Sequence, residues 1–158
     1  MNKDNEAFMQ EAIRLSIQNV EKGNGGPFGA VVVKDGKIIA RGVNNVTSHN
    51  DPTAHAEVVA IREACKLLKS FQLEGCEIYA SCEPCPMCLG AIYWARPDKL
   101  FYANSKEDAA AILFDDQFIY EEIARPINER KLFTQQMLRD EALQAFEKWS
   151  QSTTKKEY

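Results

Sequence analysis

The stretch FGAVVVKDGKIIARGV spans residues 28–43 and decides the fold class. Its two apolar runs, 28–33 and 38–43, flank the dipeptide Asp35-Gly36, a strong short-range signal for a β-hairpin. The continuous run GAVVV is typical of a strand that is buried on both faces. Because such a sheet needs helices on both sides, the sequence predicts an α/β protein.

Helical and strand patterns continue on both sides of this hairpin. Apolar residues recur at helical spacing over residues 6–22, and the runs 77–80 and 99–103 are predicted strands. Helices between the later strands indicate crossover connections, and therefore a mixed sheet. The remaining predicted helices cover residues 84–95, 107–113, 118–124 and 135–150.

The segment after the hairpin is predicted to be a polar loop, NNVTSHND at 44–51, followed by a helix. That helix is expected to start near Asp51-Pro52, where a cap residue precedes a proline suited to the first helical position. Its predicted buried stripe consists of Val58, Ile61, Cys65 and Leu68.

Length and composition narrow the class of protein. The chain has 158 residues, 45% hydrophobic and 27% charged, which fits one globular domain. A net charge of −4 argues against nucleic acid as the main partner, because phosphate binding requires clustered Lys and Arg. No run approaches the ~20 apolar residues of a membrane span, and the polar N-terminus lacks a signal-peptide core. We therefore expect a cytoplasmic protein whose five cysteines do not form a disulfide framework.

Residues in two short motifs have the types and the spacing of metal ligands. Cys85 and Cys88 are three residues apart at a predicted helix start, so both sulfurs face the same way and the helix N-terminus lowers their pKa. His55 can add an imidazole from another helix start. One His and two Cys leave the fourth position of a zinc ion to water, which marks a catalytic site. Glu57 would then lie near the metal, as proton transfer requires.

Cys82 leaves a second interpretation of the cysteines open. It precedes Cys85 by three residues, so Cys82, Cys85, Cys88 and His55 could form a closed structural zinc site. A non-catalytic zinc module of this kind would leave Glu57 without a role. The other two cysteines, Cys65 and Cys76, are predicted to be inert buried thiols.

The motifs HAE at 55–57 and PCPMC at 84–88 together are the signature of zinc nucleobase deaminases. With GGPFGAVVVKDG, NNVTSHNDPTAHAEVVAIR, SCEPCPMCLGAIYWARP, FDDQFIY and the terminal KKEY, the chain resembles the cytidine deaminase-like superfamily nearly end to end. More narrowly, it resembles the small bacterial guanine deaminases. The resemblance implies a three-layer α/β/α sandwich with a central mixed five-stranded sheet. It also implies one zinc-dependent deaminase domain over 1–158, with 151–158 as a tail that closes an active site.

The resemblance also implies the reaction. It assigns His55, Cys85 and Cys88 as ligands of one Zn²⁺ per subunit and Glu57 as the proton shuttle. The implied activity is a hydrolysis of guanine to xanthine and ammonia, with zinc hydroxide attacking C2.

The implied substrate contacts are Asn44, Phe28, Trp94, Asp116 and Tyr158, with Asp116 also counted as catalytic. An ionised Asp116 can accept hydrogen bonds from N1–H and the 2-amino group of guanine, the Asn44 amide can donate and accept, and aromatic faces can stack on the base. Without the resemblance, Asn44 would be a turn residue, Asp116 a solvated one, Phe28 and Trp94 core residues, and the end of the chain a frayed tail.

The sequence leaves three competing functions open. A tRNA adenosine deaminase shares DPTAHAE and EPCPMC but needs basic residues for phosphates, and a nucleoside deaminase needs room for a ribose. The third is the non-catalytic zinc module. The expected partners are a small purine base and a second copy of the chain in a homodimer, with the tail of one subunit over the other's site. Membrane and nucleic acid are not expected partners.

Overall fold

The computed structural model describes residues 3–114 and 116–158. The chain divides into two units, residues 1–117 and 118–158, and each is described by itself. The first unit holds a four-stranded sheet in the order β2-β1-β3-β4. Its strands are β1 (Gly29–Lys34), β2 (Lys37–Val43), β3 (Cys76–Cys82) and β4 (Lys99–Asn104). β1 is antiparallel to β2 and β3, whereas β3 and β4 are parallel, so the sheet is mixed as predicted.

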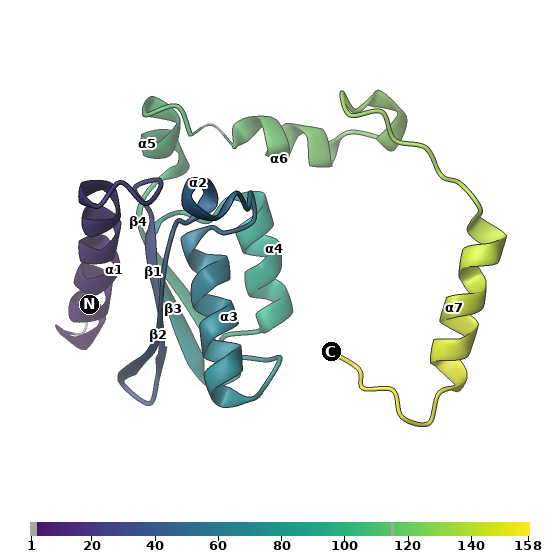
Figure 1. Cartoon of the computed structure of the whole chain (residues 1–158), viewed down its shortest axis with the longest axis horizontal. Coiled ribbons are helices and arrows are strands. Elements are labelled where there is room, and N and C mark those ends of the chain that lie inside the picture. The colour runs from purple at the N-terminus through teal and green to yellow at the C-terminus, as the bar shows by residue number, and fades with distance from the viewer. Residues whose placement is uncertain (1–2, 115) are drawn as a thin grey trace. The chain divides into compact units, whose positions relative to one another are not determined.

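Helices cover both faces of this sheet. Helix α1 (Lys3–Glu21) lies on one face, and α3 (Ala56–Leu68) and α4 (Pro86–Ala95) lie side by side on the other (Figure 1). The α/β class and its three layers are therefore confirmed. The hairpin between β1 and β2 turns at Asp35 and Gly36, which both have positive φ as a tight two-residue turn requires.

The strand count differs from the one implied by the resemblance. Within the described residues the sheet has four strands and not five. After β4 the chain forms helices, because stretches such as EALQAFEKW combine strong helix formers and Ser105 and Asp108 make a capping box. These elements are α5 (Lys106–Ala111), α6 (Gln117–Ala124), the 3₁₀ helix η1 (Ile127–Glu129) and α7 (Arg139–Gln151).

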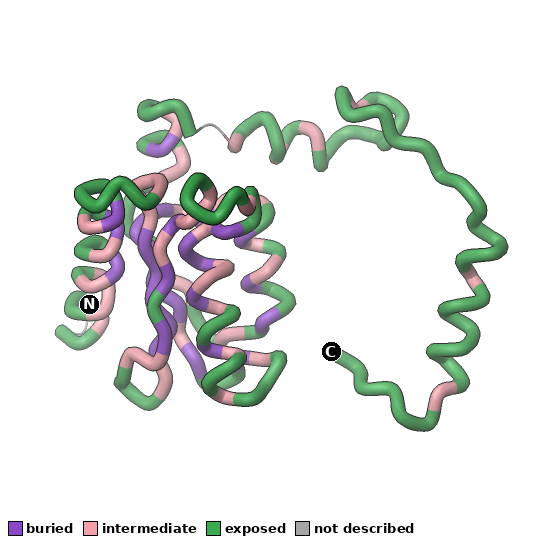
Figure 2. The backbone as a smooth tube through the Cα atoms, in the orientation of Figure 1, coloured by how far each residue is buried: buried purple, intermediate pink, exposed green. Residues whose placement is uncertain are grey.

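The core lies on both faces of β1 and β3, whose residues are buried along almost their whole length (Figure 2). Val31, Val33 and Tyr79 face Ala12 of α1. The alternate residues of these strands, Ala30, Val32 and Ile78, pack with side chains of α3 and α4. Both faces of β1 are apolar for this reason, as the continuous run GAVVV predicts.

The segment between β2 and β3 differs from its prediction in two ways. Residues 44–51 are not all loop, because Val46–His49 form the short helix α2, and α3 begins at Ala56 instead of near 51. The most deeply buried apolar stripe of α3 is Ala56, Ala60 and Ala64, while the predicted stripe is only partly buried. The small side chains let the helix backbone approach β2 so closely that a methyl group at Gly42 would overlap with it.

An ion-pair cluster ties α1 to β2. Glu11 accepts a hydrogen bond from Arg14 Nε and one from Arg41 Nε, each at 2.7 Å. The hydrogen bond from Arg14, assisted by Arg41, lowers the pKa of Glu11 from 4.5 to about 2.

Glu11→Gln is expected to lower the melting temperature by about 3 °C at pH 7, because the lost ion pair contributes about 1 kcal/mol to the free energy of unfolding. The carboxylate is ionised more readily in the folded chain, so its contribution is present above pH 4.5 and disappears as the pH falls towards 2. Melting curves of the parent and the variant should therefore converge over that range. Glu21→Gln, at the exposed end of the same helix, is the control. A pH-independent difference for Glu11→Gln would contradict the ion-pair assignment.

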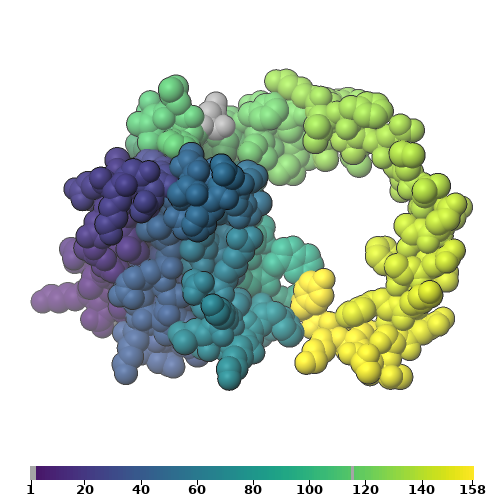
Figure 3. Space-filling model, viewed as in Figure 1, coloured from purple at the N-terminus to yellow at the C-terminus, as the bar shows by residue number. Residues whose placement is uncertain are grey.

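The second unit has no core of its own. None of the side chains of residues 118–158 is buried, neither in α6, η1 and α7 nor in the segments that join them, which form the light-green to yellow part of the chain in Figure 3. Its exposed large apolar side chains include Phe118, Leu132, Phe133, Met137, Phe146 and Trp149. Across the described part of the chain, no helix is both long and apolar enough to cross a membrane.

Candidate active site

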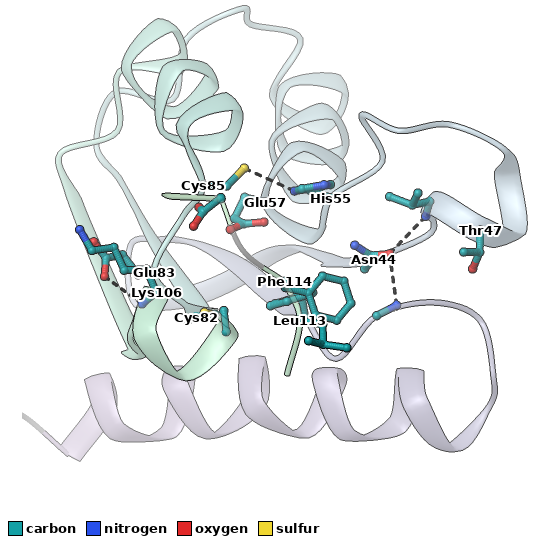
Figure 4. A pocket seen from close by; sticks show the side chains of 15 residues that line it. Asn44, Thr47, His55, Glu57, Cys82, Glu83, Cys85, Lys106, Leu113 and Phe114 are labelled. Atoms are coloured by element: carbon teal, nitrogen blue, oxygen red, sulfur yellow. Dashed lines mark hydrogen bonds between the residues drawn. The ribbon is translucent and has the colours of Figure 1, made fainter. Parts of the chain in front are cut away.

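A cavity of about 400 Å³ opens in the first unit near the carboxyl ends of β3 and β4. Its wall combines five segments: the loop after α1, the chain after β2, the start of α3, the start of α4 and the stretch that follows β4 (Figure 4). The parallel pair β3 and β4 sends both following loops to this edge, which is where open α/β sheets hold their ligands.

Three potential metal ligands meet at this cavity. His55 immediately precedes α3, Cys85 immediately precedes α4, and Cys88 lies in the first turn of α4. His55 Nδ1 is 3.6 Å from Cys85 Sγ and 3.4 Å from Cys88 Sγ. A tetrahedral zinc with bonds of about 2.3 Å to sulfur and about 2.0 Å to nitrogen would hold such atoms about 3.5 Å apart. The cluster therefore fits one zinc ion, with Nδ1 as the histidine ligand atom.

One thiol of the cluster is already in the form that binds metals. Hydrogen bonds from Cys88 and His55 lower the pKa of the Cys85 thiol to about 4, so this sulfur is a thiolate at neutral pH. The hydrogen bond to Cys85 raises the pKa of His55. Thiolate is the form in which cysteine binds metals, and the two helix starts add positive potential that stabilises it.

Glu57 lies in the first turn of α3 and is only 7% exposed. Burial raises the pKa of its carboxyl group. Its Oε2 accepts a hydrogen bond from Cys88 Sγ at 3.5 Å, and the residue lines the cavity beside His55. A carboxyl group with a raised pKa next to a metal site suits proton transfer at neutral pH.

Three of the predicted substrate contacts also line the cavity: Phe28, Asn44 and Asp116. Phe28 packs edge-to-face against Phe114, with ring centroids 5.0 Å apart. The structure thus brings an aromatic wall, an amide and a carboxylate to the same cavity as Glu57 and the metal ligands.

Trp94 and Tyr158 do not line this cavity. Trp94 is 62% exposed, because the buried face of α4 is formed by Cys88, Ile92 and Ala95 and Trp94 lies on another face. Tyr158 belongs to the second unit, where it is exposed. Both residues stay predictions as substrate contacts.

Cys82 does not join the metal cluster. The only group of potential ligands found among the described residues is His55, Cys85 and Cys88, and the Cys82 thiol instead donates to the backbone carbonyl of Ser105 at 3.6 Å. Burial raises the pKa of Cys82 to about 11. The closed four-ligand site is therefore excluded in this structure, and a zinc ion held by the other three residues would keep its fourth position for water.

Sequence reasoning missed several residues of the cavity wall. Phe114, Glu83 and Lys106 line it, and Glu83 Oε2 accepts a hydrogen bond from the Lys106 backbone N–H at 3.2 Å. Phe114 begins the motif FDDQFIY that contains Asp116, so its position beside that carboxylate was the available signal. Residue 115 lies outside the described residues.

The chain is similar to known deaminases. The cytidine and deoxycytidylate deaminase zinc-binding region matches residues 2–104. Guanine deaminase of Bacillus subtilis (strain 168) is 57% identical over 155 residues, which span 98% of this chain and 99% of that protein. The tRNA-specific adenosine deaminase of Aquifex aeolicus (strain VF5) is 45% identical over 98 residues, which span 62% of this chain and 64% of that protein.

Two solved structures show the same relation. The X-ray structure of guanine deaminase from Bacillus subtilis has a TM-score of 0.95 at 57% identity and covers 100% of this chain and 99% of that one. A structure of guanine deaminase from Nitrosomonas europaea has a TM-score of 0.68 at 35% identity, and the match covers 78% of this chain and 68% of that one. With its His-Cys-Cys cluster and buried glutamate, the chain belongs to the zinc-binding cytidine and deoxycytidylate deaminase family.

Proposed function

We propose that the protein is a hydrolase that deaminates guanine to xanthine and ammonia, with one Zn²⁺ per subunit. The observation that carries this proposal is the cluster of His55, Cys85 and Cys88 beside the buried Glu57, in a cavity that also holds a carboxylate and an aromatic pair. The similarity to guanine deaminases over nearly the whole chain supports the choice of base.

When bound, zinc acts as a Lewis acid that lowers the pKa of water from 15.7 to about 7. Glu57 accepts the proton of the water that adds to C2, and it delivers that proton to the amino nitrogen leaving as ammonia. The raised pKa of Glu57 suits both directions of transfer, because the group must bind and release a proton near neutral pH.

The cavity wall supplies groups that match guanine. The Asp116 carboxylate accepts hydrogen bonds from N1–H and the 2-amino group, which orients C2 towards Glu57. Phe28 and Phe114 form an apolar wall for the flat base, and Asn44 adds a polar contact.

We also propose that the active protein is a cytoplasmic homodimer in which both units belong to one deaminase domain. The second unit buries none of its side chains, so it needs an apolar surface outside itself. Helix α4 of the first unit exposes Tyr93 and Trp94. In the proposed dimer, residues 151–158 of one subunit close the partner's site, where Tyr158 and Trp94 complete the aromatic wall.

Deletion of residues 155–158 is expected to raise the KM for guanine by at least about tenfold, because the deleted tail would no longer exclude water or contact the base. Zinc content should be unchanged, since the metal cluster lies in the first unit. Lys155→Ala is the control, because it changes the tail without removing Tyr158. An unchanged KM for guanine in the truncated protein would contradict the proposal that the tail closes the site.

The function itself is tested with zinc-loaded protein by following the ultraviolet conversion of guanine to xanthine and the release of ammonia. A tRNA adenosine deaminase would instead act on tRNA and bind it with strong salt dependence. No release of ammonia from guanine, with zinc bound, would overturn the proposal. The tRNA-specific relative matches only 62% of the chain, whereas the guanine deaminase of Bacillus subtilis matches 98%.

A further inference from the structure

Asn19 is a buried residue that borders the candidate site without lining it. It lies near the end of α1, is 2% exposed, and is absent from the cavity wall. Its Nδ2 donates to two backbone carbonyls, Gly26 O at 2.9 Å and Asn44 O at 2.8 Å. Because both partners are acceptors, only the NH₂ end of the amide fits there. Asn19 thus ties α1 to two segments that form the cavity.

The side chain of Asn44 is held at its oxygen end. Asn44 Oδ1 accepts hydrogen bonds from the backbone N–H groups of Gly26 at 3.3 Å and Val46 at 3.2 Å. Two bonds occupy both lone pairs of a carbonyl oxygen. The Nδ2 end of this amide lies on the side of His55 and Glu57 (Figure 4). Asn44 therefore presents a hydrogen-bond donor to the cavity, and its acceptor is used by the backbone.

The backbone around Asn44 has little room for another arrangement. A methyl group at Gly25 would overlap with the carbonyl oxygen of Asn44, so the two chain segments are already in close contact. That same carbonyl oxygen is the one that Asn19 holds. Displacement of the Asn44 backbone would also turn the amide that faces the cavity.

Within the described part of the chain, the amide of Asn19 is paired at its NH₂ end only. Its Oδ1 is buried and has no hydrogen-bond partner among the described residues, although buried polar atoms are nearly always paired. Burying this oxygen without a partner lowers the free energy of unfolding, whereas the NH₂ group of the same amide bridges the two segments. A residue retained only for packing would be apolar or fully paired.

We propose that Asn19 is a positioning residue for the substrate. By holding the carbonyls of Gly26 and Asn44, it fixes Asn44 as a donor to a hydrogen-bond acceptor of a purine base, either a ring nitrogen or the 6-oxo group. This inference rests on the proposed function, since it concerns how that cavity recognises its base.

Asn19→Ala is the first test, with Ser16→Ala as its matched control. Ser16 is a buried residue of the same helix whose hydroxyl donates only to Ile13 O, one turn back, and does not line the cavity. Asn19→Ala is expected to raise the KM for guanine about tenfold, the factor for one lost hydrogen bond, with kcat within about threefold. Ser16→Ala should leave KM unchanged at a similar loss of melting temperature, and zinc content should stay constant in both.

A second variant keeps the proposal testable should Asn19→Ala not fold. In Gly25→Ala the added methyl group would overlap with the same carbonyl oxygen of Asn44, and this variant is expected to raise KM in the same way. If Asn19→Ala or Gly25→Ala folds and keeps the parent's KM, the positioning role is overturned.

Equilibrium binding of base analogues gives a readout that does not depend on turnover when parent and variant both also carry Glu57→Gln, which keeps guanine from being consumed. The analogues 3-deazaguanine, 7-deazaguanine and 6-thioguanine remove or weaken one acceptor each. One of them is expected to bind the parent about tenfold more weakly than guanine, and this penalty should vanish in Asn19→Ala. Equal penalties in parent and variant would overturn the inference. Failure of the parent with Glu57 intact to release ammonia while it still binds guanine would overturn the proposed function alone.

Discussion

Replacement of Glu57 by glutamine is expected to lower kcat for guanine about 10³-fold, the usual contribution of a positioned general acid–base group. Glutamine has nearly the same shape but cannot accept the proton of water or deliver it to the leaving nitrogen. Glu57 is not one of the three metal ligands, so the variant should retain one zinc per subunit. The measurement pairs ultraviolet assays on guanine with metal analysis of the same samples.

The matched control is Glu63→Gln on the same helix. Glu63 is exposed and does not line the cavity, so its variant should retain the kcat of the parent. Turnover by Glu57→Gln at more than a tenth of the parent rate would show that another group moves the proton. Loss of zinc from the variant would show that Glu57 holds the metal.

Replacement of Cys85 by serine is expected to lower the zinc content from about one per subunit to near zero. The thiol of Cys85 has a pKa of about 4 and binds as a thiolate, whereas a serine hydroxyl stays protonated at neutral pH. The Lewis acid contributes several kcal/mol to the transition state, so turnover should fall by more than about 10³-fold. Zinc analysis and the guanine assay measure the two effects.

Cys82→Ser is the matched control for this experiment. A serine hydroxyl can replace the thiol in its bond to the Ser105 carbonyl, and Cys82 lies outside the metal cluster. This variant should therefore keep its zinc and most of its activity. Zinc loss from Cys82→Ser as well as from Cys85→Ser would support the closed four-ligand site that the structure excludes.

The elements that were predictable from sequence are those with strong local signals. The hairpin at Asp35 and Gly36 has a turn whose backbone conformation few other dipeptides adopt, and β1 is an unbroken apolar run. Helix α2 was missed because four residues carry no periodic pattern. The buried alanine stripe of α3 was missed because a helical pattern reports which residues are apolar, and the closeness of β2 decides which of them are deepest.

The sequence alone determined the chemistry of this protein. The motifs HAE at 55–57 and PCPMC at 84–88 indicate a zinc deaminase, because few side chains bind zinc and this pair of motifs is the signature of those enzymes. Tertiary structure decided which cysteines share the cluster, which nitrogen of His55 faces them, and which end of the Asn44 amide faces the cavity. These are properties of distances and hydrogen bonds between segments far apart in the chain, so no local pattern of residues contains them.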